Sequence, residues 1–213
     1  MSARPVRATG SAADFLPGER TLPALREAAA RCRGCHLWQR GTQTVFGAGP
    51  RKARVMLVGE QPGNDEDVAG APFVGPAGRV LDRALEAVGV DRRDVYVTNV
   101  VKHFKWEAKG QRRIHTKPSQ LEITACLPWL EAELDVVKPA ALVCLGATAA
   151  QALLGPTFRV TRQRGEWVRA RWAPRAMATI HPSAILRAPD DEARRAEMER
   201  FVADLALLQE VRG

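Results

Sequence analysis

Four short runs of apolar residues recur along the chain. They cover residues 54–59, 95–101, 141–146 and 176–180, and each is continuously apolar rather than alternating. Continuous apolar runs are typical of strands that are buried on both faces, as in a parallel sheet. The pattern therefore predicts a central parallel four-stranded sheet.

The segments between these runs carry apolar residues at helical spacing. Helices are expected at residues 22–31, 76–88, 119–137, 147–154 and 190–211. The third begins with a capping box, in which Ser119 precedes Glu122 by three positions. Alternating strands and helices predict an α/β fold, a three-layer α/β/α sandwich, whose functional sites gather at the carboxyl ends of the strands.

The composition of the chain bounds its organisation. A length of 213 residues with 46% hydrophobic and 26% charged residues excludes wholesale disorder. Residues 1–20 are rich in Ala, Arg, Pro and Gly and are expected to form a flexible N-terminal arm, and residues 21–213 a single domain. The apolar stretch 139–155 is shorter than the roughly 20 residues of a membrane helix. We therefore expect a soluble, cytoplasmic monomer with no membrane partner.

The net charge and the residues at the strand ends indicate possible partners and a possible functional site. A formal charge of +8 favours a polyanionic partner such as nucleic acid, although a merely soluble basic protein fits it equally well. Glu60 and Gln61 follow the first apolar run, Asn99 lies within the second, and His181 and Ser183 follow the fourth. Each position alone is weak evidence, but together they place polar groups at one sheet edge, which predicts a site there.

A basic segment, residues 102–118, follows the second run. It carries six cations against the single Glu107: Lys102, Lys105, Lys109, Arg112, Arg113 and Lys117. A solvated charged loop would have this composition. The interleaved Phe104 and Trp106 favour a nucleic-acid strand instead, because cations pair with phosphates and rings stack on bases.

The four cysteines fall into two pairs. Cys32 and Cys35 have the spacing of a common metal half-site, whereas seventeen residues separate Cys126 from Cys144. Four thiolates are compatible with zinc or with an iron–sulfur cluster, and spacing does not choose between them. Taken alone, Cys144 in its apolar strand would be interpreted as a small buried hydrophobe.

Several motifs together resemble the family 4 uracil-DNA glycosylases. They are GEQPG at residues 59–63, PFVGPAG at residues 72–78, Asn99 and HPS at residues 181–183. The resemblance covers the chain from about residue 22 to its end. It implies a uracil-DNA glycosylase-like fold, and a [4Fe–4S] cluster held by Cys32, Cys35, Cys126 and Cys144. Gln61, together with the inserted segment 112–115 (RRIH), is similar to the UdgX branch of that family.

The UdgX resemblance implies a protein that excises uracil and is then joined covalently to the abasic sugar through His115. The other roles that it implies are catalytic for Glu60, Asp67, His181 and Gln61, uracil-binding for Gln61, Phe73, Asn99 and His181, and DNA-binding for Lys102, Lys109, Arg112, Arg113 and Ser183. Glu60 and Asp67 would stabilise the cationic sugar, or orient His115 or a water. The expected partner is uracil-containing DNA, in single strands.

Two positions depart from the branch. Gln111 replaces a lysine of the inserted segment, which removes one cation beside the DNA, and Asn64 stands where the branch usually carries Asp. Two other functions stay open. One is a conventional glycosylase that turns over with water, and the other is a non-catalytic, metal-containing nucleic-acid module.

Overall fold

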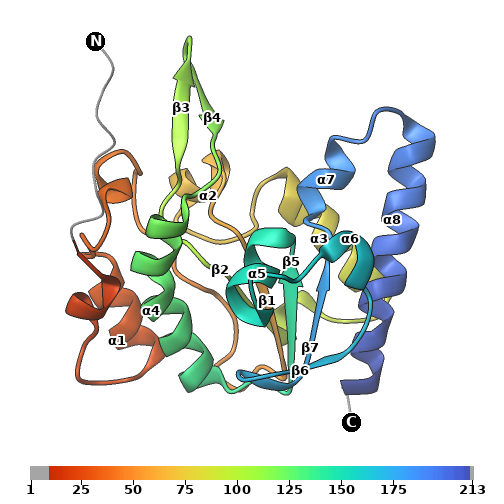
Figure 1. The fold of residues 1–213 in the computed structure, drawn as a ribbon, viewed down its shortest axis with the longest axis horizontal. Coiled ribbons are helices and arrows are strands. Elements are labelled where there is room, and N and C mark those ends of the chain that lie inside the picture. The colour runs from red at the N-terminus through yellow and green to blue at the C-terminus, as the bar shows by residue number, and fades with distance from the viewer. Residues whose placement is uncertain (1–9, 212–213) are drawn as a thin grey trace.

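The computed structural model describes residues 10–211, and its centre is a five-stranded sheet. The strand order is β2 (Val95–Asn99), β1 (Val55–Gly59), β5 (Ala141–Leu145), β7 (Ala173–Thr179) and β6 (Val168–Ala170). The first four strands are parallel, as the apolar runs predict. The fifth, β6, pairs antiparallel with β7 at the sheet edge (Figure 1) and was not predicted, because three half-exposed residues leave no apolar run.

Helices cover both faces of the sheet and complete the expected sandwich (Figure 1). One face carries α1 (Leu22–Ala29), α4 (Gln120–Val137) and α5 (Ala147–Leu154). The other carries α3 (Pro76–Ala87), α7 (Pro182–Leu186) and α8 (Asp191–Ala206). The short helices α2 (Asn64–Ala69) and α6 (Val160–Gln163) lie in connecting segments. The predicted capping box of α4 is confirmed, since Ser119 accepts from the Glu122 amide and Glu122 accepts from the Ser119 amide.

The basic segment contains a β-hairpin rather than a long irregular loop. Strand β3 (Trp106–Lys109) pairs antiparallel with β4 (Arg112–His115), so that Trp106 lies opposite His115. Gly110 turns the chain with a φ of +61°, which a residue with a side chain rarely adopts. The hairpin stands out from the body of the molecule (Figure 1).

The expected N-terminal arm is partly structured. Residues 1–9 lie outside the described residues. Residues 12–15 form a 3₁₀ helix, η1 (Ala12–Phe15), capped by Ser11, and the fully buried Ala12 belongs to the same apolar cluster as α1 and α4. In the described part of the chain, no helix combines the length and the apolar character needed to cross a membrane.

Candidate active site

A cavity of about 600 Å³ lies at the carboxyl ends of the parallel strands. Seven residues predicted from the sequence line it: Glu60, Gln61, Phe73, Asn99, His115, His181 and Ser183. They come from segments that are far apart in the chain, and the parallel sheet brings them together because its strands end at one edge. Thr148 and Arg187, which were not predicted, also line the cavity, as does Lys117 of the basic segment.

One wall of the cavity is an aromatic ring beside an unsatisfied amide. Phe73 has a φ of +56°, unusual for a bulky residue, and its ring lies 5.8 Å from the ring of His181. Asn99 is 2% exposed, and its Oδ1 is buried without a hydrogen-bond partner in residues 10–211. A Cβ on Gly59 would lie 2.4 Å from that Oδ1 and 2.7 Å from the Phe73 ring. Gly59 therefore permits the two groups to meet at the end of β1.

The hydrogen bonds of His181 determine its tautomer. The Ser183 amide donates to Nδ1 over 3.1 Å, so Nδ1 carries no proton and the neutral ring is protonated on Nε2. Burial lowers the pKa of His181 to about 4, with a smaller opposing effect from the carboxylate of Glu60. At neutral pH His181 is therefore an uncharged ring with one N–H free to donate.

Glu60 forms the link between the sheet and the hairpin. Its Oε1 lies 3.3 Å from Nε2 of His115, and its Oε2 accepts a hydrogen bond from the hydroxyl of Thr148 on α5. Burial alone would raise the pKa of Glu60, but the hydrogen bonds from His115 and Thr148 outweigh it and the pKa is lowered. A carboxylate thus lies beside the half-exposed ring of His115, whose side chain is 49% exposed.

Gln61 fixes the base of the hairpin. Its Nε2 donates to the carbonyls of Lys105 and Thr116, at 3.2 and 3.0 Å, and its Oε1 accepts from the Lys105 amide at 3.1 Å. Both ends of the hairpin are therefore held by one buried amide. Gln61 lines the cavity as predicted, but its polar atoms bind the backbone.

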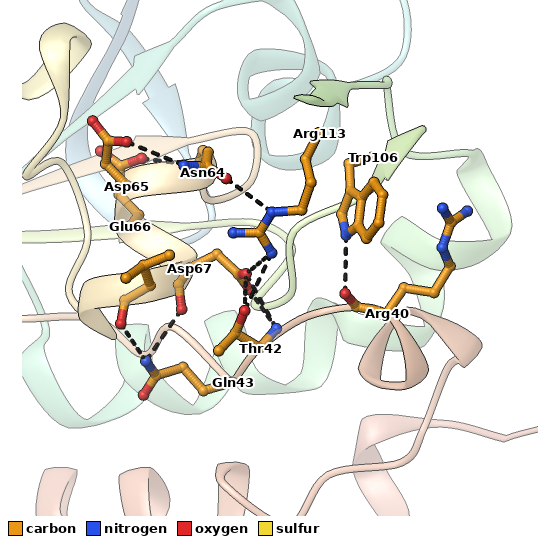
Figure 2. A network of polar contacts seen from close by, with 11 residues as sticks. Arg40, Thr42, Gln43, Asn64, Asp65, Glu66, Asp67, Trp106 and Arg113 are labelled. Carbon is orange, nitrogen blue, oxygen red and sulfur yellow. Dashed lines mark hydrogen bonds and ion pairs between the residues drawn. The ribbon is translucent and has the colours of Figure 1, made fainter. Parts of the chain in front are cut away.

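Arg113 and Asp67 join the hairpin to α2 (Figure 2). Nη1 of Arg113 lies 2.6 Å from Oδ2 of Asp67 and 3.2 Å from Oγ1 of Thr42, and Nε donates to Asn64 over 2.9 Å. Asp67 is fully buried and also accepts from the amide and hydroxyl of Thr42. Asp67 does not line the cavity, and through Arg113 it contacts the hairpin that carries His115. We call this arrangement of Arg113, Asp67, Asn64 and Thr42 the hairpin clamp.

The aromatic residues of the basic segment are used inside the protein. The Trp106 indole donates to the Arg40 carbonyl over 2.9 Å, and the guanidinium of Arg40 lies 4.3 Å from the ring centre (Figure 2). Arg113 lies 5.5 Å from the ring centre of Phe104, which is 1% exposed. The prediction that these rings are free to stack on bases is therefore wrong for Phe104, and Trp106 is held between two guanidinium groups.

The cations of the segment differ in their availability. The prediction that Lys102 binds DNA is wrong, because its side chain is fully buried and forms an ion pair with the buried Glu133. Arg113 is committed to the hairpin clamp, and Lys105 pairs with Glu122 at 2.9 Å. The exposed cations are Lys109, Arg112 and Lys117. Three of the six cations of the basic segment are therefore exposed and able to contact a polyanion.

Three of the four cysteines lie close together. The thiol of Cys126 has its pKa raised to about 12, chiefly by burial, with further contributions from Cys35 and Cys32. Cys126 Sγ accepts a hydrogen bond from the Lys102 amide over 3.2 Å. Cys144 is buried in β5, and burial is the only cause of its raised pKa, with no contribution from another thiol. All four cysteines belong to one apolar cluster of buried residues, in which Cys144 lies on β5.

In the described residues, the cysteines do not form a compact site for a single metal ion. Within residues 10–211, no three His, Cys, Asp or Glu side chains come close enough to hold a single metal ion. An iron–sulfur cluster holds its ligands farther apart than one ion does, because several metal and sulfide atoms lie between them. One of these thiols, that of Cys126, accepts a backbone N–H, a contact that also occurs at the sulfurs of iron–sulfur clusters.

Comparison with known proteins supports a single family. The sequence profile described as "Uracil DNA glycosylase superfamily" matches residues 46–206. The Type-4 uracil-DNA glycosylase of Sulfurisphaera tokodaii is 35% identical over 178 residues, which cover 80% of this chain and 78% of that protein. The Type-4 enzyme of Pyrobaculum aerophilum is 36% identical over 190 residues, 85% of this chain and 91% of that protein. The Type-5 enzyme of the same organism is 31% identical over 182 residues, 77% and 76% of the two chains.

Proposed function

The chain belongs to the uracil-DNA glycosylase superfamily, and we propose that it excises uracil from DNA and is then joined to the abasic sugar through His115. The observation that carries the excision step is the buried, unpartnered Oδ1 of Asn99 in the cavity. A buried acceptor without a donor is costly, so it is expected where a ligand supplies the donor. The N3–H of uracil is such a donor.

The cavity suits a base that has left the helix stack. Uracil in a duplex is inaccessible, so it must be flipped out or already single-stranded. Phe73 offers a ring for stacking, and Asn99 offers an acceptor to N3–H and a donor to O4. Cytosine has no proton on N3 and carries an amino group in place of O4, so it would leave both groups of Asn99 poorly matched.

The neutral His181 suits the departing base. Cleavage of the N-glycosidic bond moves its electron pair onto uracil, whose O2 becomes negative. The Nε2–H of His181 would donate to O2, and Nδ1 stays held by the Ser183 amide. With a pKa of about 4, His181 acts as a neutral donor at physiological pH and transfers no proton.

We assign Glu60 and His115 to the reaction at the sugar. Loss of uracil leaves a cationic sugar, which the carboxylate of Glu60 would stabilise. A ring nitrogen of neutral His115 then attacks C1′ with its lone pair and forms an N–C bond. The resulting imidazolium loses the proton of its other nitrogen to Glu60 or water, so the charges balance.

The attachment of the hairpin supports attack by His115 rather than by water. Gln61 holds the two ends of the hairpin, and the hairpin clamp holds the residue two positions before His115. A nucleophile fixed beside the reacting carbon has a large advantage over a diffusing water. Arg113 and Gln61 are positioning residues in this proposal, and DNA is bound by the exposed cations Lys109 and Arg112 together with Arg187 at the cavity rim.

A conventional glycosylase that turns over with water is the second candidate. The half-exposed His115 leaves room for solvent, and Glu60 could orient a water toward C1′ as readily as it orients an imidazole. Both candidates share the excision step and differ only in the group that attacks the sugar.

A single-stranded oligonucleotide with one uracil separates the candidates. The protein in excess should release uracil and give a shifted band that survives heat and denaturant. Release of uracil with multiple turnovers and no such band would refute the covalent step. No release at all would refute the excision step.

His115→Ala and Arg112→Ala form a matched pair of variants. His115→Ala should still release uracil but should leave a free abasic site, because water replaces the imidazole. Arg112→Ala removes an exposed cation of the same hairpin and should keep the shifted band. A band that persists in His115→Ala would assign the covalent link to another residue.

We also propose that the chain holds an iron–sulfur cluster, as its family resemblance implies. The converging thiols of Cys32, Cys35 and Cys126 support it. The cluster would tie the end of α1 to α4 and supply no step of the reaction. Its absorption in the visible range, with iron and sulfide in equal amounts, would support this, and stoichiometric zinc in a colourless protein would refute it.

A further inference from the structure

A second basic surface lies beside the hairpin, apart from the cations already assigned to DNA. Residues 28–59 contain no Asp or Glu and carry six cations: Arg31, Arg33, Arg40, Arg51, Lys52 and Arg54. The last three precede β1 at its amino end, away from the cavity, whereas Arg33 and Arg40 lie on either side of the 3₁₀ helix η2 (His36–Gln39). The exposed Trp38 belongs to η2, so this short stretch combines two cations with an indole.

Both of these arginines lie over indole rings. The guanidinium carbon of Arg33 is 4.8 Å from the ring centre of Trp38, and that of Arg40 is 4.3 Å from the ring centre of Trp106 (Figure 2). A ring covers one face of a guanidinium and leaves the N–H groups in its plane free to bind phosphate oxygens. Both arginines are exposed, and within residues 10–211 neither side chain donates a hydrogen bond or forms an ion pair. Their N–H groups are therefore available to a ligand.

This surface adjoins the hairpin that carries His115. Trp106 lies directly opposite His115 in the hairpin, and its indole donates to the Arg40 carbonyl over 2.9 Å (Figure 2). Arg40 is therefore held beside the hairpin, and Arg33 lies farther along the same segment. A DNA strand that brings a sugar to His115 would place the phosphates on one side of that sugar near Arg40, and the next ones near Arg33.

The carboxylates that contact this segment leave its charge in place. Asp67 and Glu122 are buried, and each is paired with a cation of the basic segment. Arg31 differs from its neighbours, because the carboxylate of Glu27 lies 3.3 Å from it. The two stacked guanidinium groups therefore present positive charge to solvent, each held against a ring.

We propose that Arg33 and Arg40 bind phosphates of the DNA strand that carries the uracil, on one side of the flipped nucleotide, and that Trp38 and Trp106 position the two guanidinium groups. We call these four residues the stacked-arginine surface. The proposal rests on the proposed function for the identity of the strand, and it extends the DNA contact beyond the hairpin and the cavity rim. Arginines of a merely solvated face would behave differently, because their loss would change only the overall charge.

Binding of a fluorescent single-stranded oligonucleotide without uracil tests the surface independently of excision. Arg33→Ala combined with Arg40→Ala should weaken binding about 25-fold at 0.1 M salt and lower the slope of log affinity against log salt by about 1.4, because two phosphate contacts are lost. The matched control, Arg51→Ala combined with Lys52→Ala, removes the same charge from exposed positions at the amino end of β1 and should leave the slope unchanged. Equal slopes in the two double variants would overturn the proposal.

Single variants keep the test decisive if the double variant loses its fold or its iron. Arg33→Ala and Arg40→Ala should each weaken binding about fivefold at 0.1 M salt and lower the slope by about 0.7. Trp38→Ala should weaken binding with a nearly unchanged slope, since the charge stays, and Trp38→Phe should restore most of the affinity because it keeps a ring. Binding by Trp38→Ala that is as tight as that of the wild type would overturn the positioning role.

Uracil release in a single turnover shows whether the surface serves the substrate strand. The double variant of Arg33 and Arg40 should raise the half-saturating concentration of a uracil-containing oligonucleotide far more than it lowers the maximal rate. Shortening the oligonucleotide to one nucleotide on one side of the uracil should remove this difference from the wild type. A difference that survives shortening on either side would overturn the proposal. Protein that shows the expected salt slopes but releases no uracil would refute the proposed function and leave the stacked-arginine surface supported.

Discussion

Loss of Arg113 should redirect the reaction from His115 to water. The substitution Arg113→Ala removes the ion pair with Asp67 and the hydrogen bonds to Asn64 and Thr42. The cavity residues on the sheet are left unchanged. We therefore expect uracil excision to continue while the hairpin that carries His115 is held less firmly.

The structure sets the size of the effect. Removing one partner of a buried ion pair costs about 3–5 kcal/mol. The side chain of Arg113 is 21% exposed, and Thr42 keeps two donors on Asp67, so the cost is expected to be about 2 kcal/mol. If the whole of this free-energy cost weakens the docking of the hairpin, attack by His115 slows by up to roughly thirtyfold. Attack by water is unaffected, so the ratio of adduct to free abasic DNA falls by the same factor.

The assay measures that ratio in a single turnover on denaturing gels. The matched control is Arg112→Ala, which removes an equal charge from the adjacent, exposed position. Arg112→Ala should weaken DNA binding and reduce its salt dependence by about one charge, with an unchanged ratio. The double variant that combines Asp67→Asn with Arg113→Ala should weaken the docking of the hairpin by less than the sum of the two single variants. In the double variant no buried carboxylate is left without its partner. Equal ratios of adduct to free abasic DNA in the two arginine variants would refute the proposed role of the hairpin clamp. Recovery of the wild-type ratio by Arg113→Ala at low salt would refute it as well.

Three further predictions concern the same framework. Asn64→Asp should raise the adduct ratio two- to threefold at low salt, because a charged acceptor binds Arg113 about 0.5 kcal/mol more strongly at an exposed site. Glu133→Gln should lower the free energy of unfolding by about 3–5 kcal/mol, because it leaves Lys102 buried without its carboxylate. His181, whose pKa falls on folding to about 4, should make stability increase from pH 4 to pH 6.5, by at most about 1.4 kcal/mol per pH unit.

Each of these has a control. The effect of Asn64→Asp should vanish at high salt, and one that persists would contradict a charge effect. Asp135→Asn, at an exposed position of α4, should leave urea denaturation unchanged, so a loss equal to that of Glu133→Gln would contradict the buried pair. His181→Gln should reduce the slope by about half and not abolish it, because burial also lowers the pKa of His103 to about 4. An unchanged slope in His181→Gln would contradict the contribution of His181.

The regular elements could be predicted from the sequence because local signals define them. Helix α5 has the predicted bounds, between Gly146 and Gly155, and the capping box identifies the start of α4. The hairpin was not predicted, since its strands show no apolar alternation and are held by contacts with Gln61 and α2. The glycine turn at residue 110 is the one local signal that could have indicated it.

The sequence predicted the site residues that lie at strand ends. It did not predict those side chains whose burial depends on a partner far away in the chain. Asn99 and His181 are at the sheet edge because their strands end there. Lys102 has the same sequence character as an exposed cation, and its burial depends on an ion pair with Glu133, 31 positions away in the chain. The ligand role of Cys144, which the family resemblance implies, stays a prediction, because a buried position in β5 is equally typical of a core residue.

Lys102 links the candidate active site to the region of the cysteines. Its ammonium group donates to the Asn99 carbonyl and the Thr98 hydroxyl, and its amide donates to the sulfur of Cys126. One buried residue therefore couples the sulfur of Cys126 to the backbone that carries Asn99, so a change at either end should be transmitted to the other.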